Sequence, residues 1–167
     1  MTRTLLVIDV QNDYFDGGVV PLWQALETEA RIRDGIGRAR AHGDRIVLVR
    51  HVSATATGLF APDSEGAAIR PSILAAAGDA PVVVKHHADA FQETGLAAHL
   101  AGTDTLLVCG MMTQNCVVFT ALSPSAGGLR VRVVGDLCTA PSEAVHRFAV
   151  SALRSKGLLT DLEEVWG

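Results

Sequence analysis

Three residues of complementary chemistry, Asp9, Lys85 and Cys116, each lie at or just after the end of a short apolar run. The runs are LLVIDV (5–10), PVVVKH (81–86) and TLLVCG (105–110). A thiol is a nucleophile, a carboxylate can move its proton, and an ammonium group can hold both charges in place. Together the three groups would suit acyl transfer through a covalent intermediate.

Cys116 also stands where the sequence predicts the start of a helix, CVVFTALSPSAGG. The positive end of a helix dipole and a nearby Lys85 would both lower the pKa of the thiol. The turn before the cysteine could aim backbone N–H groups at a developing oxyanion. These features predict a reactive thiolate.

Each residue taken alone has an ordinary explanation as well. An Asp after a strand commonly caps a loop, a lysine is commonly solvated, and free cysteine is among the most buried residue types. Cys109 and Cys138, inside and beside apolar runs, are interpreted as core residues. The catalytic interpretation therefore depends on a fold that brings three strand ends to one edge.

Such a fold is what the apolar runs predict. Besides the three runs that end at or near Asp9, Lys85 and Cys116, two more runs predict strands, RIVLVRH (45–51) and RVRVVGD (130–136). A weaker sixth is GLLTD (157–161). Near-continuous apolar character is typical of strands buried on both faces of a parallel sheet, whereas RVRVVGD alternates and is expected nearer an edge.

Helical patterns separate these strands, at 27–43, 94–102, 116–128 and 142–157. In the last, Ser142 is the expected N-cap, and Val145, Phe148, Ala149 and Ala152 are the expected buried face. Strands that alternate with helices predict right-handed crossovers and a three-layer α/β/α sandwich. Segments 11–26 and 52–80 fit no long element, and such segments often form binding loops or lids.

Composition limits the class of protein. The length of 167 residues predicts a single domain, 1–167, and 49% apolar with 19% charged residues is an ordinary globular profile. A net charge of −4 without a basic cluster argues against a nucleic-acid partner, and no apolar run approaches membrane-spanning length. Three cysteines without a CxxC pair predict a reducing, cytoplasmic location.

Five segments of the chain resemble the isochorismatase-like hydrolase superfamily, in its cysteine hydrolase and amidase branch, and they occur in family order nearly from end to end. They are LLVIDVQNDYFDGG (5–18), IVLVRHVS (46–53), VVVKHHADAFQETGL (82–96), LLVCGMMTQNCVVFTA (106–121) and VVGDLCTAPSEAVH (133–146). The combination of D-x-Q-N-D, K-x(5)-F and G-x-x-T-x-x-C-V is specific, although each motif alone is weak.

The resemblance implies a six-stranded parallel sheet in the order 3-2-1-4-5-6 with a Rossmann-like arrangement of helices. It also implies a catalytic triad of Asp9, Lys85 and Cys116, and a cis peptide between Met111 and Met112. The N–H groups of Met112 and Cys116 would then form the oxyanion hole. The implied activity is hydrolysis of an amide, ureido or carbamoyl C–N bond of a small molecule through a thioester.

The chain departs from the nicotinamidases of this superfamily, which carry an Asp-x-His near the end of the second strand to bind a metal. Here that region reads VRHVSATATGLF, with His51 alone, and the adjacent His86 and His87 would point to opposite faces of a strand. A zinc site requires at least three converging ligands. We therefore expect no metal and no cofactor.

His51 either touches the substrate or forms a local hydrogen bond. Members that cleave the vinyl ether of isochorismate lack the nucleophilic cysteine, which is present here.

Substrate identity is beyond the sequence, but pocket residues can be suggested. Those expected to bind substrate are Gln11, Phe15, Phe91 and Asn115, with Tyr14 as a further candidate; Trp23, Phe60 and Phe119 are interpreted as packing or subunit contacts. The resemblance also suggests a homodimer or homotetramer. Two other classes stay open: a non-catalytic oligomeric binding protein on the same fold, and a redox-sensing protein that uses Cys116. A metal-assisted nicotinamidase is a third alternative.

Overall fold

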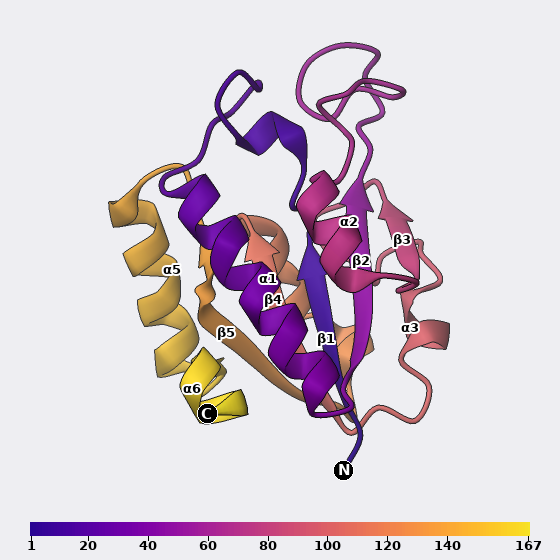
Figure 1. Cartoon of the computed structure of the whole chain (residues 1–167), viewed down its shortest axis with the longest axis vertical. Coiled ribbons are helices and arrows are strands. Elements are labelled where there is room, and N and C mark those ends of the chain that lie inside the picture. Colours follow the sequence, from indigo (N-terminus) through magenta and orange to yellow (C-terminus); the bar gives the residue numbers. More distant parts are fainter.

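A computed structural model describes residues 1–167 and contains a six-stranded sheet, all parallel, in the order β3-β2-β1-β4-β5-β6 (Figure 1). The strands are β1 (Arg3–Ile8), β2 (Arg45–His51), β3 (Val82–Lys85), β4 (Thr105–Met111), β5 (Arg130–Thr139) and β6 (Leu159–Thr160). The predicted α/β sandwich and its strand order are confirmed.

Helices cover both faces of this sheet. The principal ones are α1 (Ala25–Ala41), α2 (Pro71–Ala77), α3 (Leu96–His99), α4 (Val118–Ala121), α5 (Glu143–Ser155) and α6 (Leu162–Trp166). The chain moves outward from β1 through β2 to β3, then returns to β4 and moves the opposite way. Right-handed crossovers therefore place α1 and α2 on one face, with α4 and α5 on the other. No helix is long and apolar enough to cross a membrane.

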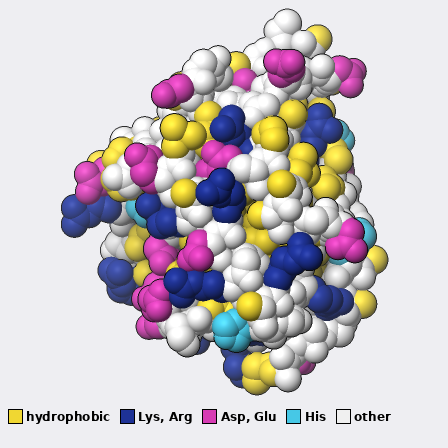
Figure 2. Space-filling model, viewed as in Figure 1, with side chains coloured by type: hydrophobic (Ala, Val, Ile, Leu, Met, Phe, Trp, Pro, Cys, Tyr) yellow, Lys and Arg dark blue, Asp and Glu magenta, His cyan; other side chains and the backbone are white.

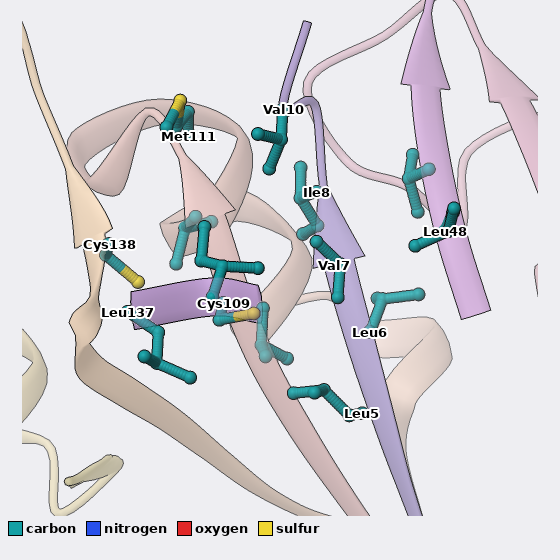
Figure 3. Close-up of a cluster of buried hydrophobic side chains, with 14 of the residues drawn as sticks. Leu5, Leu6, Val7, Ile8, Val10, Leu48, Cys109, Met111, Leu137 and Cys138 are labelled. Atoms are coloured by element: carbon teal, nitrogen blue, oxygen red, sulfur yellow. The ribbon is translucent and has the colours of Figure 1, made fainter. Parts of the chain in front are cut away.

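The core is built around the two central strands. Leu5, Leu6, Val7 and Ile8 of β1 are almost completely buried, as are Val108 and Cys109 of β4. In Figure 3, Cys109 lies beside Leu137 and Cys138 of β5, so Cys109 and Cys138 are core residues as expected. Strand β3 differs from the expected burial on both faces. It is an edge strand in which Val82 and Val84 are exposed, while Val83 and Lys85 point inward.

Helix α5 confirms its predicted cap but only part of its predicted face, since Ala149 is buried and Val145 is half-buried. The Ser142 hydroxyl accepts a hydrogen bond from the N–H of Val145. The buried residues are Ala149 and Leu153, whereas Phe148 is 79% exposed and Ala152 is also exposed. The apolar stripe of α5 is wider than the part that packs on the sheet. The sequence pattern therefore could not tell which of its apolar residues are buried and which are exposed.

One face of the molecule shows no strong segregation of charge. On the face drawn in Figure 2, basic and acidic side chains are interspersed, with apolar groups between them. This distribution agrees with the small net charge of −4 and offers no basic stripe for a phosphate backbone.

Candidate active site

The three expected catalytic residues meet at the carboxyl edge of the sheet, where the strand order reverses between β1 and β4. Asp9 directly follows β1, Lys85 ends β3, and Cys116 lies in the turn after β4. Crevices at such a reversal are the usual ligand sites of open parallel sheets. The loops 11–24 and 52–70, which are parts of the segments 11–26 and 52–80 that fitted no long element, lie at this same end, and both chain termini lie at the other (Figure 1).

Asp9 turns the chain as β1 ends. Its φ is 52°, in the left-handed region, which costs a non-glycine residue about 1 kcal/mol or more and is best tolerated by Asp and Asn. This turn explains why β1 ends at Ile8, although the apolar run continues to Val10. The N–H of Asp9 donates to the carbonyl of Val49 at 3.0 Å, so the turn is fixed against β2.

Gly110 lets β4 approach β1 closely beside Asp9. A Cβ atom at this position would lie 2.1 Å from the carbonyl oxygen of Ile8, and the φ of Gly110 is +118°. Any side chain here would therefore push the loop that carries Cys116 away from Asp9.

We expect Gly110→Ala to destabilise the fold by at least about 2 kcal/mol, because it combines a main-chain clash with an unfavourable φ. Gly37→Ala is a matched control, since Gly37 is exposed in α1 with open space at its Cβ position. The control should be neutral or stabilising by up to about 1 kcal/mol. Urea unfolding measures both variants, and equal effects would contradict the close-approach argument.

The ammonium group of Lys85 is the centre of the site. Its Nζ atom lies 2.8 Å from Asp9 Oδ2, 2.7 Å from His51 Nδ1, 2.9 Å from the carbonyl oxygen of His87 and 3.3 Å from Cys116 Sγ. Asp9 and Lys85 are 0% exposed and Cys116 is 3% exposed. A buried ammonium requires such a set of acceptors, because desolvation of an unpaired charge is very unfavourable. The solvated-lysine explanation of Lys85 is therefore excluded.

Burial sets the ionisation of the carboxylate and the thiol. Desolvation raises the pKa of Asp9, and the Lys85 charge opposes that rise. Both Asp9 oxygens lack a hydrogen bond from any N–H or O–H group beyond the Lys85 ion pair. Desolvation, followed by the charge of Asp9, raises the pKa of Cys116 to about 12, although Lys85 lowers it.

Burial therefore opposes the expected reactive thiolate, and the raised pKa of Cys116 favours a neutral thiol in the resting site. The physical reason lies in the helix as well as in burial. Cys116 belongs to η2 (Thr113–Val117), a π-helical turn, and α4 after it has only four residues. So short a helix supplies little dipole to offset the desolvation of a thiolate.

The Met111–Met112 peptide is cis, as the family resemblance implies. The turn after it is anchored from a second side, because Thr113 Oγ1 lies 2.8 Å from His146 Nδ1 on α5. Met112 accepts hydrogen bonds from the N–H groups of Asn115 and Val117, which closes the turn on itself. The nucleophile thus lies on a well-fixed segment.

The four residues expected to bind substrate have different surroundings. The side-chain amide of Gln11 is fully used within the protein, by His51 and by the carbonyl of Ala67. Phe15 is buried under the guanidinium of Arg70, 4.2 Å from its ring centre. These contacts make Gln11 and Phe15 parts of the wall that holds the loops together. Phe91 is 9% exposed, and Asn115 is half-buried with no side-chain hydrogen bond inside the chain.

Two further aromatic residues lie close to the site. Tyr14 is buried, and desolvation, followed by the charges of Asp9 and Cys116, raises the pKa of its hydroxyl. Phe60 packs edge-on against Tyr14 with ring centres 4.8 Å apart and lies 5.7 Å from the His51 ring. Phe60 is a packing residue as expected, and the long loop after β2 also brings it beside the His51 ring, which the sequence did not show.

The remaining histidines lie apart from the thiol. His86 Nδ1 lies 2.8 Å from the carbonyl of Val52, and His87 Nε2 lies 3.1 Å from Glu93. Only His51 joins Asp9 and Cys116 in a group whose polar atoms lie within 4.8 Å of one another.

The fold and the site define a parallel α/β protein with a buried carboxylate, ammonium and thiol at its strand-order reversal. The family model for the isochorismatase domain matches residues 3–164, and the chain belongs to the isochorismatase family. It is a hydrolase of that family.

Relatives of known sequence and structure support this assignment. The isochorismatase family protein YddQ of Bacillus subtilis is 32% identical, with 92% of each chain covered. Streptothricin hydrolase of Streptomyces noursei is 33% identical over 80% of this chain and 48% of its own length. The crystal structure of an isochorismatase family protein from Desulfovibrio vulgaris superposes with a TM-score of 0.88 at 28% identity, covering 98% of this chain and 96% of that chain.

Proposed function

We propose that this hydrolase cleaves the C–N bond of a small amide, ureido or carbamoyl compound through a thioester on Cys116. The observation that carries the proposal is the buried Lys85 ammonium, 2.8 Å from Asp9 and 3.3 Å from Cys116. Streptothricin hydrolase, and the nicotinamidase of Escherichia coli at 27% identity over 99% of both chains, are relatives whose names agree with such chemistry.

The first half of the reaction follows from the resting ionisation. Asp9 is the acceptor for the proton of the neutral Cys116 thiol, and the sulfur attacks the carbonyl carbon as that proton leaves. Transfer at the moment of attack avoids a buried thiolate, which the high pKa of Cys116 disfavours. Asp9 then returns the proton to the departing nitrogen, and the C–N bond breaks to leave an acylated Cys116. Throughout, Lys85 stabilises whichever of the two groups carries the negative charge.

The second half returns the site to its starting state. Asp9 takes a proton from water, which attacks the thioester carbonyl and releases a carboxylic or carbamic acid. The proton then returns to the Cys116 sulfur. We further propose that the N–H groups of Met112 and Cys116 bind the oxyanion in both halves, an assignment that rests on the family resemblance. Phe91 and Asn115 remain our candidates for contacts with substrate.

Metal assistance does not fit the donor atoms at this site. Asp9, His51 and Cys116 are close enough to share an ion, but the Lys85 ammonium lies among all three. A divalent ion there would meet a positive charge, and Lys85 already occupies the His51 Nδ1 lone pair. We therefore assign no step to a metal.

The other classes left open by the sequence receive less support. Redox-sensing cysteines are accessible and have a low pKa, whereas Cys116 is buried and its pKa is raised to about 12. A pure binding protein would have no need of a buried ion pair against a thiol.

We propose that residues 1–167 act as one domain within a homodimer or homotetramer. Phe119, Leu122 and Phe148 are 55%, 49% and 79% exposed, and all three lie on or next to α4 and α5. Burial against a second copy would remove these apolar side chains from water. Gel filtration with light scattering measures the assembly, and Phe148→Asp should shift it toward monomer.

The test of the activity is a screen for released ammonia over small amides, ureas and carbamoyl compounds. The wild-type protein should release ammonia from at least one of them, and Cys116→Ala should release none above background. Release that persists in Cys116→Ala would show that the thiol is not the nucleophile.

The acid limb of the pH profile should report Asp9. The carboxylate must be ionised to accept the thiol proton, and burial raises its pKa above the ordinary value of 3.8. We therefore expect kcat/KM to fall as the pH is lowered toward that raised pKa, with a midpoint above 3.8. Burial lowers the pKa of His51 to about 4, so its protonation would add a second loss in acid. A profile that is flat down to pH ~4 would contradict the role of Asp9.

A further inference from the structure

His51 is the one group near the thiol whose part is not explained by the proposed reaction. It ends β2 and is the register neighbour of Lys85 on β3, so the two side chains lie side by side. Its Nδ1 atom is 2.7 Å from Lys85 Nζ. An ammonium can only donate hydrogen bonds, so Nδ1 must present a lone pair. The ring is therefore neutral, and its single proton is on Nε2.

The position of this ring is tightly fixed. Gln11 binds the backbone of His51 twice, accepting from its N–H and donating to its carbonyl, each at 2.8 Å. The ring of Phe60 lies against the imidazole with centres 5.7 Å apart. Asp13 in turn accepts a hydrogen bond of 2.7 Å from the N–H of Phe60 and so holds that loop residue in place. Neither the ring nor its Nε2–H needs to reorganise in order to bind a partner.

The Nε2–H is a donor with no acceptor in the protein. The hydrogen bond of the His51 side chain uses Nδ1 alone, and Nε2 is not among the buried atoms without a partner, so it reaches accessible space. An imidazole nitrogen of His51 lies within 4.8 Å of both Cys116 Sγ and an Asp9 oxygen. A fixed imidazole beside the nucleophile, with an accessible donor that no protein group uses, is suited to binding substrate.

We propose that His51 binds the substrate through Nε2–H and selects compounds with a second hydrogen-bond acceptor, besides the carbonyl oxygen, two bonds from the scissile carbonyl carbon. The spacing supplies the argument. A carbonyl carbon in position for attack lies about 3–3.5 Å from sulfur, and one nitrogen of the His51 ring lies within 4.8 Å of that sulfur. The ring is therefore near enough for its Nε2–H to reach atoms adjacent to the carbonyl group rather than the far end of a chain. α-Oxo and α-alkoxy amides have such an acceptor, whereas simple alkyl amides do not, and the second nitrogen of a ureido or N-carbamoyl group carries N–H and donates. This inference rests on the proposed amide-cleaving function.

Two variants separate the two nitrogens of His51. His51→Asn retains an oxygen near the position of Nδ1 that can accept from Lys85, but it has no donor as far out as Nε2. His51→Gln has an N–H donor near the position of Nε2 and loses the Nδ1 acceptor. If His51 served only to support Lys85, His51→Asn would be the milder change. If it binds substrate, His51→Gln retains the selectivity.

The probes are methoxyacetamide, which has an ether oxygen two bonds from the carbonyl carbon, and butyramide, which has a methylene group there. Binding of each is measured by NMR or calorimetry in the Cys116→Ala protein, which cannot turn over. We expect methoxyacetamide to bind about fivefold or more tightly than butyramide. This ratio should be retained in the Cys116→Ala/His51→Gln protein and fall to near one in Cys116→Ala/His51→Asn.

Equal binding of the two probes to Cys116→Ala, or a preference that survives in Cys116→Ala/His51→Asn, would overturn the inference. The ratio cancels any general loss of stability or of site geometry, since that would weaken both probes alike. Failure of the proposed function is a different result, in which the wild-type protein releases no ammonia from any screened compound. The ratio of the two probe affinities is measured without turnover, so it can be read whether or not the wild-type protein releases ammonia.

Discussion

Replacement of Cys116 by alanine is expected to lower the rate of C–N bond cleavage by about 10⁴-fold or more, because removal of a covalent nucleophile leaves only binding and oxyanion contacts. Substrate affinity should change little, since Cys116 contributes one small buried side chain. Single-turnover measurements of product release, with Kd measured separately, test both parts. A loss of less than about tenfold would mean that water attacks the substrate directly.

Cys138→Ala is the matched control for this experiment. Cys138 is as buried as Cys116, but its sulfur lies 3.4 Å from the carbonyl of Val134 and is not in contact with Lys85 or Asp9. The control should therefore retain activity while losing a thiol of the same kind. Rapid quenching and mass spectrometry should find an acyl group on the peptide that contains Cys116 in the wild-type and control proteins.

The strands and the meeting of the three candidate residues could be predicted because both depend on local patterns. Buried parallel strands are short apolar runs, and parallel strands bring their carboxyl ends to one edge, so residues 9, 85 and 116 had to lie near one another. The exact strand order depended on the family resemblance. Periodicity alone does not say which strand lies beside which.

The polar contacts between distant segments could not be predicted. Gln11 was expected to touch substrate, but its amide holds His51, which is 40 residues away in sequence. No local periodicity connects two such loops, and only the completed sheet places them together. Phe148 illustrates a related limit, because an apolar position on a helix is compatible with burial by the same chain or by another one.

The ionisation of Cys116 shows how fold and chemistry are linked. Sequence position pointed to a helix dipole and a neighbouring lysine, both of which favour a thiolate. In the structure the helix is a short π-helical turn, and burial outweighs the attraction of Lys85. The positive charge of Lys85 is shared with Asp9, so it stabilises one negative charge on the pair and not two. That arrangement suits a proton that moves between Asp9 and Cys116 during the reaction.

The second large effect concerns stability, and Lys85→Met is the change that tests it. This substitution preserves length and apolar bulk but leaves the Asp9 carboxylate, which is 0% exposed, without its counter-charge. Breaking a buried ion pair from one side typically costs about 3–5 kcal/mol of unfolding free energy. We expect a loss of that size at pH ~7.5, measured by urea unfolding with the fluorescence of Trp23 and Trp166.

The double variant Asp9→Asn/Lys85→Met should be more stable than Lys85→Met alone, although it is inactive, because no buried charge is left unpaired.

The loss of unfolding free energy in Lys85→Met should also depend on pH, and it should grow as the pH rises. Without Lys85 the folded-state pKa of Asp9 lies still further above its unfolded value, so the folded protein binds the proton more tightly. The stability of this variant is therefore retained at low pH and lost as the pH rises through the folded-state pKa. Additive effects of the two substitutions, to within about 0.5 kcal/mol, would contradict the coupling. Non-additivity would show that Asp9 and Lys85 form one electrostatic unit, as proton exchange with Cys116 requires.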